Sequence, residues 1–359
     1  MTVTPFPPFL PVLPEGIRLR LDEADEGMHE LGPESNFNES MYFNFYDPEH
    51  RLGGWVRLGN RANEGIAERT VCLYLPDGSV GFSYDRPAIS NNDRFEAGGM
   101  SFTFIEPFRR LDVSFAGDVL HLADGMAMAH PKQAYLDNPM VAATIDLSYE
   151  GVSPMLGGEL ESLDGSPLAD AHGGDFARGH YEQHIFGTGT VTVGEQTWQV
   201  AGAGLRDHSW GPRYWQSPWW YRWLTGNFGT EAGFVASLIV KQDGTRSMGG
   251  VVLRDGAYEQ VSDVSIRTEW DESTNTQTKV FLTLTTRAGL VYDITGEVVG
   301  MVPLRNRRKN DDGSLLTTRI AEGLTLWHCP ELSAGPGSGL SEYLDQVIDG
   351  RPVGRNEGS

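Results

Sequence analysis

Seven Asp-Gly dipeptides are spread along the chain, and they constrain its fold more than any other feature. They lie at Asp77-Gly78, Asp124-Gly125, Asp164-Gly165, Asp243-Gly244, Asp255-Gly256, Asp312-Gly313 and Asp349-Gly350. Asp-Gly tolerates the positive φ angles that tight hairpin turns need. The segments on either side of the first, 71–75 and 80–84, are rich in strand formers. The pattern therefore predicts antiparallel hairpins.

Further strand-like segments recur at short and regular spacing, several with alternating apolar and polar residues. They span 41–46, 101–105, 112–115, 142–149, 188–193, 235–241, 279–286 and 290–294. Alternation of this kind is typical of a sheet with one buried face. Only Ser341 to Ile348 has the composition of a short helix. Many antiparallel strands and little helix indicate an all-β sandwich or barrel.

The length of 359 residues favours two domains. Residues 151–179 are rich in Gly, Ser, Pro and Asp and show little periodicity, which is typical of a linker. We therefore predict an N-terminal β domain at 1–150, a linker at 151–179 and a C-terminal β domain at 180–350.

The composition limits the classes of partner and the cellular compartment that we expect for this protein. A formal net charge of -21 disfavours nucleic acid and anionic membrane surfaces as partners. The two cysteines, Cys72 and Cys329, form no disulfide framework and suit a reducing compartment. We see no signal peptide and no apolar run long enough to span a membrane. A cytoplasmic protein is expected, and a homodimer is compatible with the sequence.

The segment beginning at Arg206 concentrates ionisable and aromatic side chains. On a strand, Arg206, His208 and Trp210 share one face, while Asp207 and Ser209 share the other. A carboxylate can hold an imidazole in one tautomer and raise its basicity. Asp207 could serve His208 in this way, or it could pair with a neighbouring arginine and fix the strand end. The segment is thus either an acid–base site or the packed mouth of a barrel.

Two further groups of residues are candidates. His180, Glu182 and His184 share a strand face and could bind a metal, line a barrel or lie on the surface, but their spacing matches no zinc signature, so we predict no metal. Aromatic residues follow the His208 segment and could form the wall of a ligand pocket or a plug. These are Tyr214, Trp215, Trp219, Trp220, Tyr221, Trp223 and Phe228. The polar stretch Asn36, Asn38, Glu39 and Asn44 is interpreted as turn capping.

The motif Asp207-His208-Ser209-Trp210-Gly211 resembles the Asp-His-x-Trp core of proteins related to carotenoid 1,2-hydratase (hydroxyneurosporene synthase), a group with uncharacterised bacterial members. The segments 181–183, 322–323 and 342–343 look similar too. The resemblance implies two tandem lipocalin-like antiparallel β-barrel domains, an architecture to which fungal decalin-forming pericyclases are similar. The hydratases add water to a terpenoid double bond without a cofactor, and their motif His and Trp correspond to His208 and Trp210. Their later Tyr and Asp have no counterpart at 236–241.

We therefore predict a cofactor-independent lyase or isomerase, most specifically a hydratase or dehydratase, acting on a terpenoid, steroid or polyketide-like lipophile. Protonating an alkene needs a strong acid, which a buried carboxylic acid, Asp207 or Glu182, would supply beside His208. The substrate-binding residues expected are Tyr181, Trp210, Trp215, Trp219, Tyr221 and Trp223. The alternatives are a lipophile carrier without chemistry and a cyclase that works through pocket shape.

Overall fold

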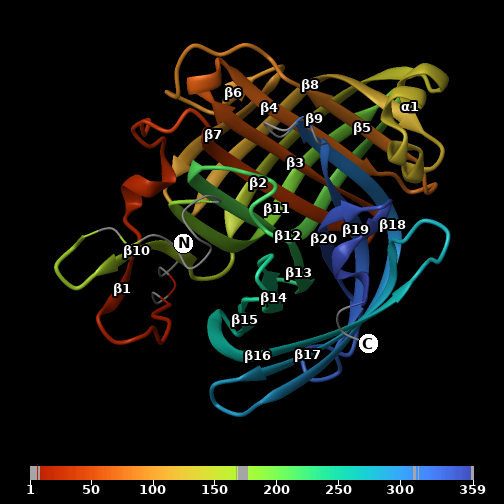
Figure 1. Ribbon diagram of the computed structural model, residues 1–359. Coiled ribbons are helices and arrows are strands. Elements are labelled where there is room, and N and C mark those ends of the chain that lie inside the picture. Colours follow the sequence, from red (N-terminus) through yellow and green to blue (C-terminus); the bar gives the residue numbers. More distant parts are fainter. Residues whose placement is uncertain are drawn as a thin grey trace. The chain divides into compact units, whose positions relative to one another are not determined.

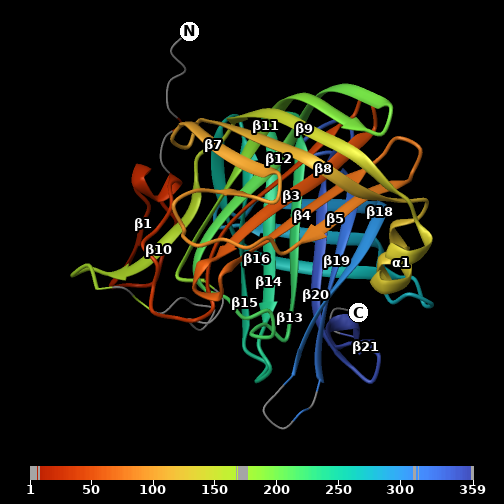
Figure 2. The ribbon, with the colours of Figure 1, turned by 90° about the horizontal axis from the view of Figure 1, so that it is seen from above.

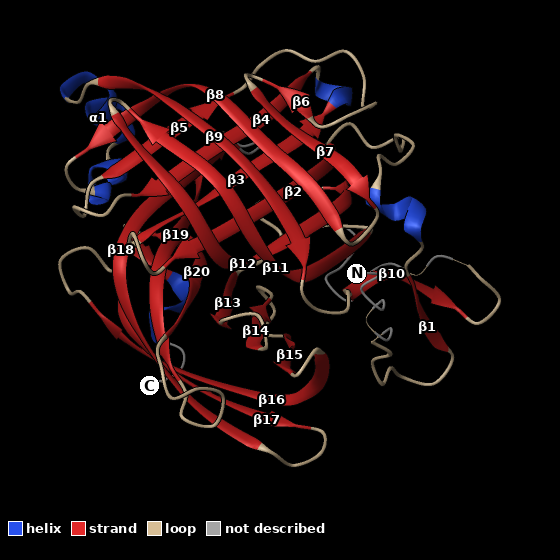
Figure 3. Cartoon of the chain, turned by 180° about the vertical axis from the view of Figure 1, so that it is seen from behind, coloured by secondary structure: helices blue, strands red, loops and turns tan. Residues whose placement is uncertain are grey.

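The computed structural model describes residues 6, 9–166, 168, 177–309, 313 and 315–356. Strands dominate it, as Figure 3 shows. The chain divides into two compact units, and the first comprises Met1–Ala123 and Asn138–Tyr214. Turns with glycine at positive φ at Gly78, Gly244 and Gly256 confirm three of the hairpins that the Asp-Gly dipeptides predict. Asp124-Gly125 forms no such turn, because Asp124 caps the 3₁₀ helix Gly125–Ala129.

The first unit is a closed barrel. Its strands are β1 (Ile17–Arg20), β2 (Phe37–Asp47), β3 (Leu52–Arg61), β4 (Ile66–Tyr74), β5 (Val80–Asp85), β6 (Glu96–Ala97), β7 (Met100–Glu106), β8 (Arg110–Leu122), β9 (Met140–Gly151), β10 (Leu156–Ser162), β11 (Gly179–Val193) and β12 (Gln196–Pro212), with the 3₁₀ helices η1 (Glu23–Glu26) and η2 (Ala62–Glu64). Antiparallel pairing runs β2-β3-β4-β5-β8-β9-β11-β12 and returns to β2 (Figure 1). Strand β10 pairs with β1 and with the first residues of β11, and in Figure 2 β1 and β10 lie side by side.

The sequence pattern explains which face of each strand turns inward. In β9 the side chains of Ala143, Ile145, Leu147 and Tyr149 are buried, while the residues between them are at least partly exposed. These four join the apolar core of the first barrel. Strand β2 is buried along its whole length, with Phe43 among its inward residues. Inward positions in this barrel can therefore be assigned by alternation from known core residues.

The second unit comprises Asp124–Asp137 and Trp215–Ser359 and is also a closed barrel. Its elements are η3 (Gly125–Ala129), α1 (Pro131–Asp137), β13 (Trp220–Phe228), β14 (Ala232–Val240), β15 (Arg246–Arg254), β16 (Ala257–Trp270), β17 (Gln277–Thr286), β18 (Val291–Lys309), β19 (Leu315–His328), β20 (Gly337–Ile348), β21 (Arg351–Pro352) and η4 (Val353–Asn356). Strands β13 to β20 pair in chain order, and β13 also pairs with β20. Its core includes Phe234, Trp327 and Tyr343.

The protein is thus all-β, with two tandem lipocalin-like antiparallel barrels, which confirms the predicted fold class. Two details differ from the predictions. The boundary moves, because β11 and β12 pair with β9 and β2 and so close the first barrel rather than open the second. The segment Ser341 to Ile348 is part of β20 and not a helix, because it pairs with β13 and β19 on its two sides.

Residues 151–179 also contain more structure than the predicted linker. Strand β10 lies within this range, while residues 167 and 169–176 fall outside the described part. No helix among the described residues is long and apolar enough to cross a membrane.

Candidate active site

The inward face of β12 presents three polar side chains, each bonded to a carboxylate from another element. Arg206 pairs with Glu26 through both terminal nitrogens, at 2.5 and 2.9 Å. The Trp210 indole Nε1 donates to Glu159 Oε1 of β10 at 2.6 Å. His208 lies between them, and the side chains of Arg206, His208 and Trp210 share one face, as the alternation predicts. All three are fully buried.

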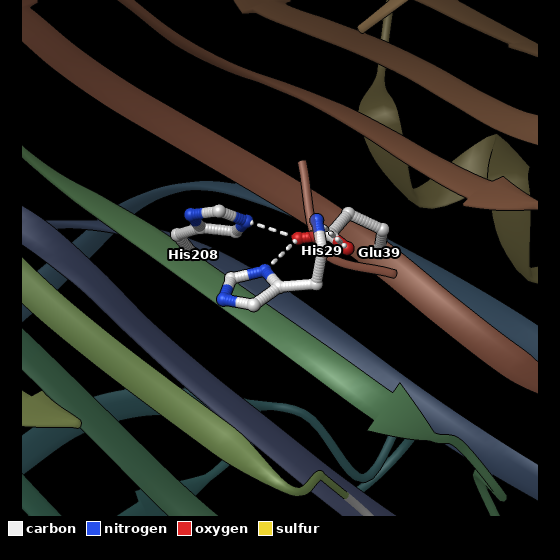
Figure 4. A group of neighbouring side chains, drawn as sticks. All are labelled: His29, Glu39 and His208. Carbon is white, nitrogen blue, oxygen red and sulfur yellow. Dashed lines mark hydrogen bonds and ion pairs between the residues drawn. The ribbon is translucent and has the colours of Figure 1, made fainter. Parts of the chain in front are cut away.

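The partner of His208 is Glu39 of β2, a residue that turn capping does not explain. Glu39 occupies an inward position on β2, in alternation with the core residues Met41 and Phe43. Its Oε1 lies 2.7 Å from Nε2 of His208 and 2.8 Å from Nδ1 of His29 (Figure 4). Its Oε2 accepts from the His29 backbone N–H at 3.1 Å and from Asn92 at 3.2 Å. One buried carboxylate therefore joins two imidazoles.

Charge keeps Glu39 ionised despite its burial. Burial acts to raise the pKa of Glu39, but hydrogen bonds and charge from His208 and His29 outweigh it and lower the pKa to about 2. Because the carboxylate holds no proton, both imidazole nitrogens that face it must be N–H donors. The movable protons of this group therefore reside on the histidines.

His29 is the partly exposed member of the group. It follows η1, and its side chain is 17% exposed, compared with 0% for Glu39 and His208. Its Nε2 lies 3.2 Å from Asp25, and its ring stacks on Trp210 with the centroids 3.9 Å apart. Burial acts to lower the pKa of His29, but Glu39 and Asp25 outweigh it and raise the pKa. A carboxylate at each ring nitrogen thus stabilises the imidazolium.

A second branch of hydrogen bonds reaches His208 from Tyr181 of β11. The Tyr181 hydroxyl lies 3.2 Å from Nδ1 of His208 and donates to Glu26 at 3.1 Å. Burial raises the pKa of Tyr181 well above its usual value, so the phenol stays protonated. Burial acts to raise the pKa of Glu26, but Arg206 outweighs it and lowers the pKa. The chain of contacts therefore runs from Glu26 through Tyr181, His208 and Glu39 to His29.

Aromatic and apolar side chains surround this polar chain. Phe37, Tyr181 and Trp210 form a buried cluster, against which Leu21, Phe108 and Met155 pack. The Phe95 ring meets the His208 ring edge-on, with the centroids 5.6 Å apart. In such surroundings the interactions between charged groups are stronger than in water.

Asp207, predicted as the catalytic acid, lies on the opposite face of β12 from His208. Its carboxylate Oδ2 is 2.6 Å from Nε2 of His180, and Glu182 Oε1 is 3.9 Å from the same nitrogen. Burial acts to raise the pKa of Asp207, but the charge of His180 outweighs it and lowers the pKa. Asp207 therefore bonds His180 rather than His208, and the acid role expected for Asp207 stays a prediction.

Two groups of side chains place their ligand atoms within 4.8 Å of one another, close enough to hold a metal ion. One is His29, Glu39 and His208, and the other is His180, Glu182 and Asp207. His184 belongs to neither group, although the sequence places it on the same strand face as His180.

The predicted aromatic residues are divided between the two units. Tyr181 and Trp210 lie at the His208 site. Trp215, Trp219, Tyr221 and Trp223 belong to the second unit. There, Tyr221 donates a hydrogen bond to Glu342, and Trp219 packs against the cluster of Trp220, Leu238 and Val240. A substrate-binding role for these four stays a prediction.

The fold and the site define a two-barrel, lipocalin-like protein with a buried histidine–carboxylate–histidine group. The chain belongs to the family described as a domain of unknown function, DUF7064, whose model matches residues 22–347. No curated protein matches the sequence. Membership of the carotenoid hydratase family itself stays a prediction.

Solved structures share the fold at low sequence identity. A protein assigned as AttH from Nitrosomonas europaea has a TM-score of 0.59 at 14% identity, covering 95% of this chain and 100% of that one. The structure of CghA with Sch210972 has a TM-score of 0.53 at 11% identity, covering 94% and 99%. Kievitone hydratase from Nectria haematococca has a TM-score of 0.49 at 10% identity, covering 86% and 89%. At such identities the likeness of the first two structures, whose TM-scores exceed 0.5, shows the fold alone.

Proposed function

We propose that this protein is a lyase or isomerase that transfers protons on a neutral, lipophilic substrate, with His208, Glu39 and His29 as its acid–base group. The observation that carries the proposal is the single buried oxygen of Glu39 bonded to two imidazoles, one fully buried and one partly exposed. Buried ion pairs are often replaceable by apolar residues without loss of stability. A group of this kind, with shifted pKa values, is therefore a candidate for chemistry rather than for folding alone.

The positions of the protons limit the reactions that this group can catalyse. The pKa values of Glu39, Glu26 and Asp207 all lie below the usual range, so these carboxylates are ionised at neutral pH. The acid available is then an imidazolium, which is much weaker than the acid that an isolated alkene requires. Imidazole chemistry suits a carbon next to a carbonyl group, where the proton removed is more acidic. We therefore place the reaction beside a carbonyl rather than at an isolated terpenoid alkene.

The reaction proposed is the loss of water from a β-hydroxy carbonyl compound, or its reverse. A neutral imidazole takes the proton from the α carbon, and the C–H electron pair forms the new C=C bond. The β C–O bond breaks, and the hydroxyl leaves as water with a proton from the second, protonated imidazole. Glu39 stabilises whichever imidazole is charged. Isomerisation uses the same first step and returns the proton to a different carbon.

The surroundings of the site favour an uncharged, apolar substrate. The polar chain contains the carboxylates of Asp25, Glu26 and Glu39, and Arg206 and the His29 imidazolium offset two of these charges. No surplus positive charge remains in this polar chain to hold an anion. The side chains packed around it include Phe37, with Trp210 stacked on His29. Aromatic walls with a few placed polar groups are typical of sites for lipophiles.

Exchange of α protons in D₂O tests the proposal without knowledge of the natural substrate. Neutral bicyclic and steroidal ketones are incubated with the protein, and deuterium uptake is followed by mass spectrometry. We expect uptake above the protein-free rate, and a decrease of about 10²- to 10⁴-fold in His208→Asn. His50→Asn is the matched control, because His50 also bonds a carboxylate, at 2.8 Å from Asp47, but is 33% exposed.

Two results would contradict the proposal. One is exchange that stays at the protein-free rate for every ketone, and the other is full exchange by His208→Asn. A ketone that binds tightly without exchange would support the carrier hypothesis instead.

A further inference from the structure

We propose that His180, Glu182 and Asp207 form a binding site for a divalent transition-metal ion on the outer face of the first barrel. The site is independent of the proposed function, because Asp207 lies on the opposite face of β12 from His208. Zinc is the reference ion, because a nitrogen and two carboxylate oxygens are among the donors that it accepts.

The strand register brings the three side chains together. Glu182 of β11 lies directly opposite Asp207 of β12, and His180 lies opposite Ser209. Residues two apart on a strand share a face, and directly opposite residues have neighbouring Cβ atoms. His180, Glu182 and Asp207 thus project from one patch of a two-stranded ribbon. The backbone ladder fixes their spacing before any ion binds.

The distances leave room for an ion. Zinc binds nitrogen and oxygen at about 2.0–2.2 Å, which places neighbouring donors about 3–4 Å apart around it. Nε2 of His180 is 2.6 Å from Asp207 and 3.9 Å from Glu182, and the three ligand atoms lie within 4.8 Å of one another. Small rotations of His180 and Asp207 would bring all three to bonding distance. The hydrogen bond between them would then be replaced by two metal bonds.

The inner group is a poorer candidate for a metal. Both oxygens of Glu39 already accept two hydrogen bonds each, and both imidazoles approach the same oxygen at 2.7 and 2.8 Å. Glu39 and His208 are also fully enclosed, whereas the side chains of His180 and Asp207 are 41% and 22% exposed. Solvent can reach the outer group, so water can supply the remaining ligands.

The charges near the outer site allow a cation. Glu182 and Asp207 supply two negative charges, and Arg213 and Arg57 act on Asp207 from nearby. Arg57 is itself paired with Glu68 at 3.5 Å. Arg213 donates to Ser209 Oγ at 2.7 Å, so part of its charge is directed away from the three ligand atoms. The two arginines oppose a cation and therefore limit its affinity, but the two carboxylates still favour it.

Titration of the metal-free protein with Zn²⁺ by calorimetry, and with Co²⁺ by absorption spectroscopy, tests the site. We expect one ion per chain and a Co²⁺ spectrum that reports nitrogen and oxygen ligands. His180→Gln and Asp207→Asn should each weaken binding by at least about 10- to 100-fold, because loss of a residue that only orients a metal ligand already has an effect of that size. The matched controls are His29→Gln and Glu39→Gln, which should leave the affinity within about threefold.

Three outcomes would overturn the proposal. The wild-type protein binds no ion, or it binds several ions weakly with no effect of the two outer substitutions, which indicates adventitious ions only. In the third outcome, the control substitutions abolish binding and the outer ones do not, which assigns the ion to His29, Glu39 and His208. Circular dichroism of each variant checks folding, and the exposed His180→Gln keeps the test valid if Asp207→Asn does not fold.

Discussion

Each barrel carries a charged group on the same strand face as its apolar core. The two groups differ in whether their side chains can gain or lose a proton. In the first barrel, Glu39 joins two imidazole rings, and an imidazole can accept and donate a proton through its nitrogens. In the second, Asp345 of β20 holds Arg222 of β13 through two contacts of 3.2 Å, and an arginine keeps its charge at any ordinary pH. Burial of charge alone therefore does not mark a functional site.

The surroundings reinforce this difference. The Arg222 guanidinium lies 4.2 Å from the Tyr343 ring centroid and 4.7 Å from that of Trp220. Such rings stabilise a permanent cation and hold it in place. His29 is also stacked on an indole, but it is partly exposed and bonded to a carboxylate at each nitrogen. One arrangement fixes a charge, and the other provides a path for a proton.

The largest expected effect is on proton transfer. Glu39→Gln keeps the shape of the side chain but removes the charge that stabilises both imidazoles. We expect α-proton exchange to decrease by about 10²- to 10⁴-fold, as for loss of an acid–base group. Deuterium uptake by the same ketones measures it. If exchange persists at the wild-type rate, the first barrel is no more functional than the second, and the comparison fails.

The next largest effect is on stability in the second barrel. Asp345→Asn leaves Arg222 buried without its counter-ion, and removing one partner of a buried pair costs about 3–5 kcal/mol. Urea denaturation measures the loss. Exchange by the protein that remains folded should be unchanged. A loss below about 1 kcal/mol, or a loss of exchange in folded protein, would show that the Arg222 pair is not purely structural.

A smaller effect is the pH dependence of stability. The pKa of His29 is raised above its unfolded value of 6.5, so its imidazolium stabilises the folded state fully below that value. This contribution is lost as the pH rises through the folded pKa. We expect the urea midpoint of the first barrel to fall with rising pH above about 6.5, and His29→Gln to remove that slope. An identical slope in His29→Gln would assign the pH dependence to other groups.

The smallest expected effect is the stability lost when the hydrogen bond of a buried indole is removed, compared between the two barrels. Trp210→Phe removes the hydrogen bond to Glu159, which keeps its bond to Arg20, so we expect a loss of about 1 kcal/mol. The matched variant in the second barrel is Trp327→Phe, which removes the bond to the Thr225 carbonyl. Thermal unfolding of both compares them. A loss above about 3 kcal/mol in Trp210→Phe would mean that the indole contributes more to the stability of the first barrel than its one hydrogen bond to Glu159.

Local sequence patterns predict the strands and hairpins, and the family resemblance implies two barrels, but neither gives the boundary between the barrels. Asp-Gly turns and strand alternation are local signals, and the structure agrees with them at turns such as Gly78 and Gly244. The boundary between the units depends on β12 pairing with β2, which is about 160 residues away in sequence, and no local pattern indicates that pairing. The same holds for Ser341 to Ile348, where pairing with two strands overrides a helical composition.

The candidate site was likewise predictable from the sequence only where a local pattern indicates it. The alternation of Arg206, His208 and Trp210 places their side chains on one face, and the structure agrees. The role of Glu39 as a site residue could not be predicted, because Glu39 follows Asn36 and Asn38, which are typical of turns. Its inward position, two residues before the core residue Met41, was the available signal. His29 follows a short 3₁₀ helix without periodicity, so only the folded chain reveals it.

The central claim is that the Glu39 group of the first barrel changes a lipophile chemically. Mass spectrometry of small molecules extracted from the natively expressed protein, followed by incubation of the extract with fresh protein, tests this most directly. We predict that wild-type protein adds or removes one water, or shifts a double bond without a change in mass, and that Glu39→Gln does neither. A ligand returned unchanged by the wild-type protein, or converted equally by Glu39→Gln, would contradict the account.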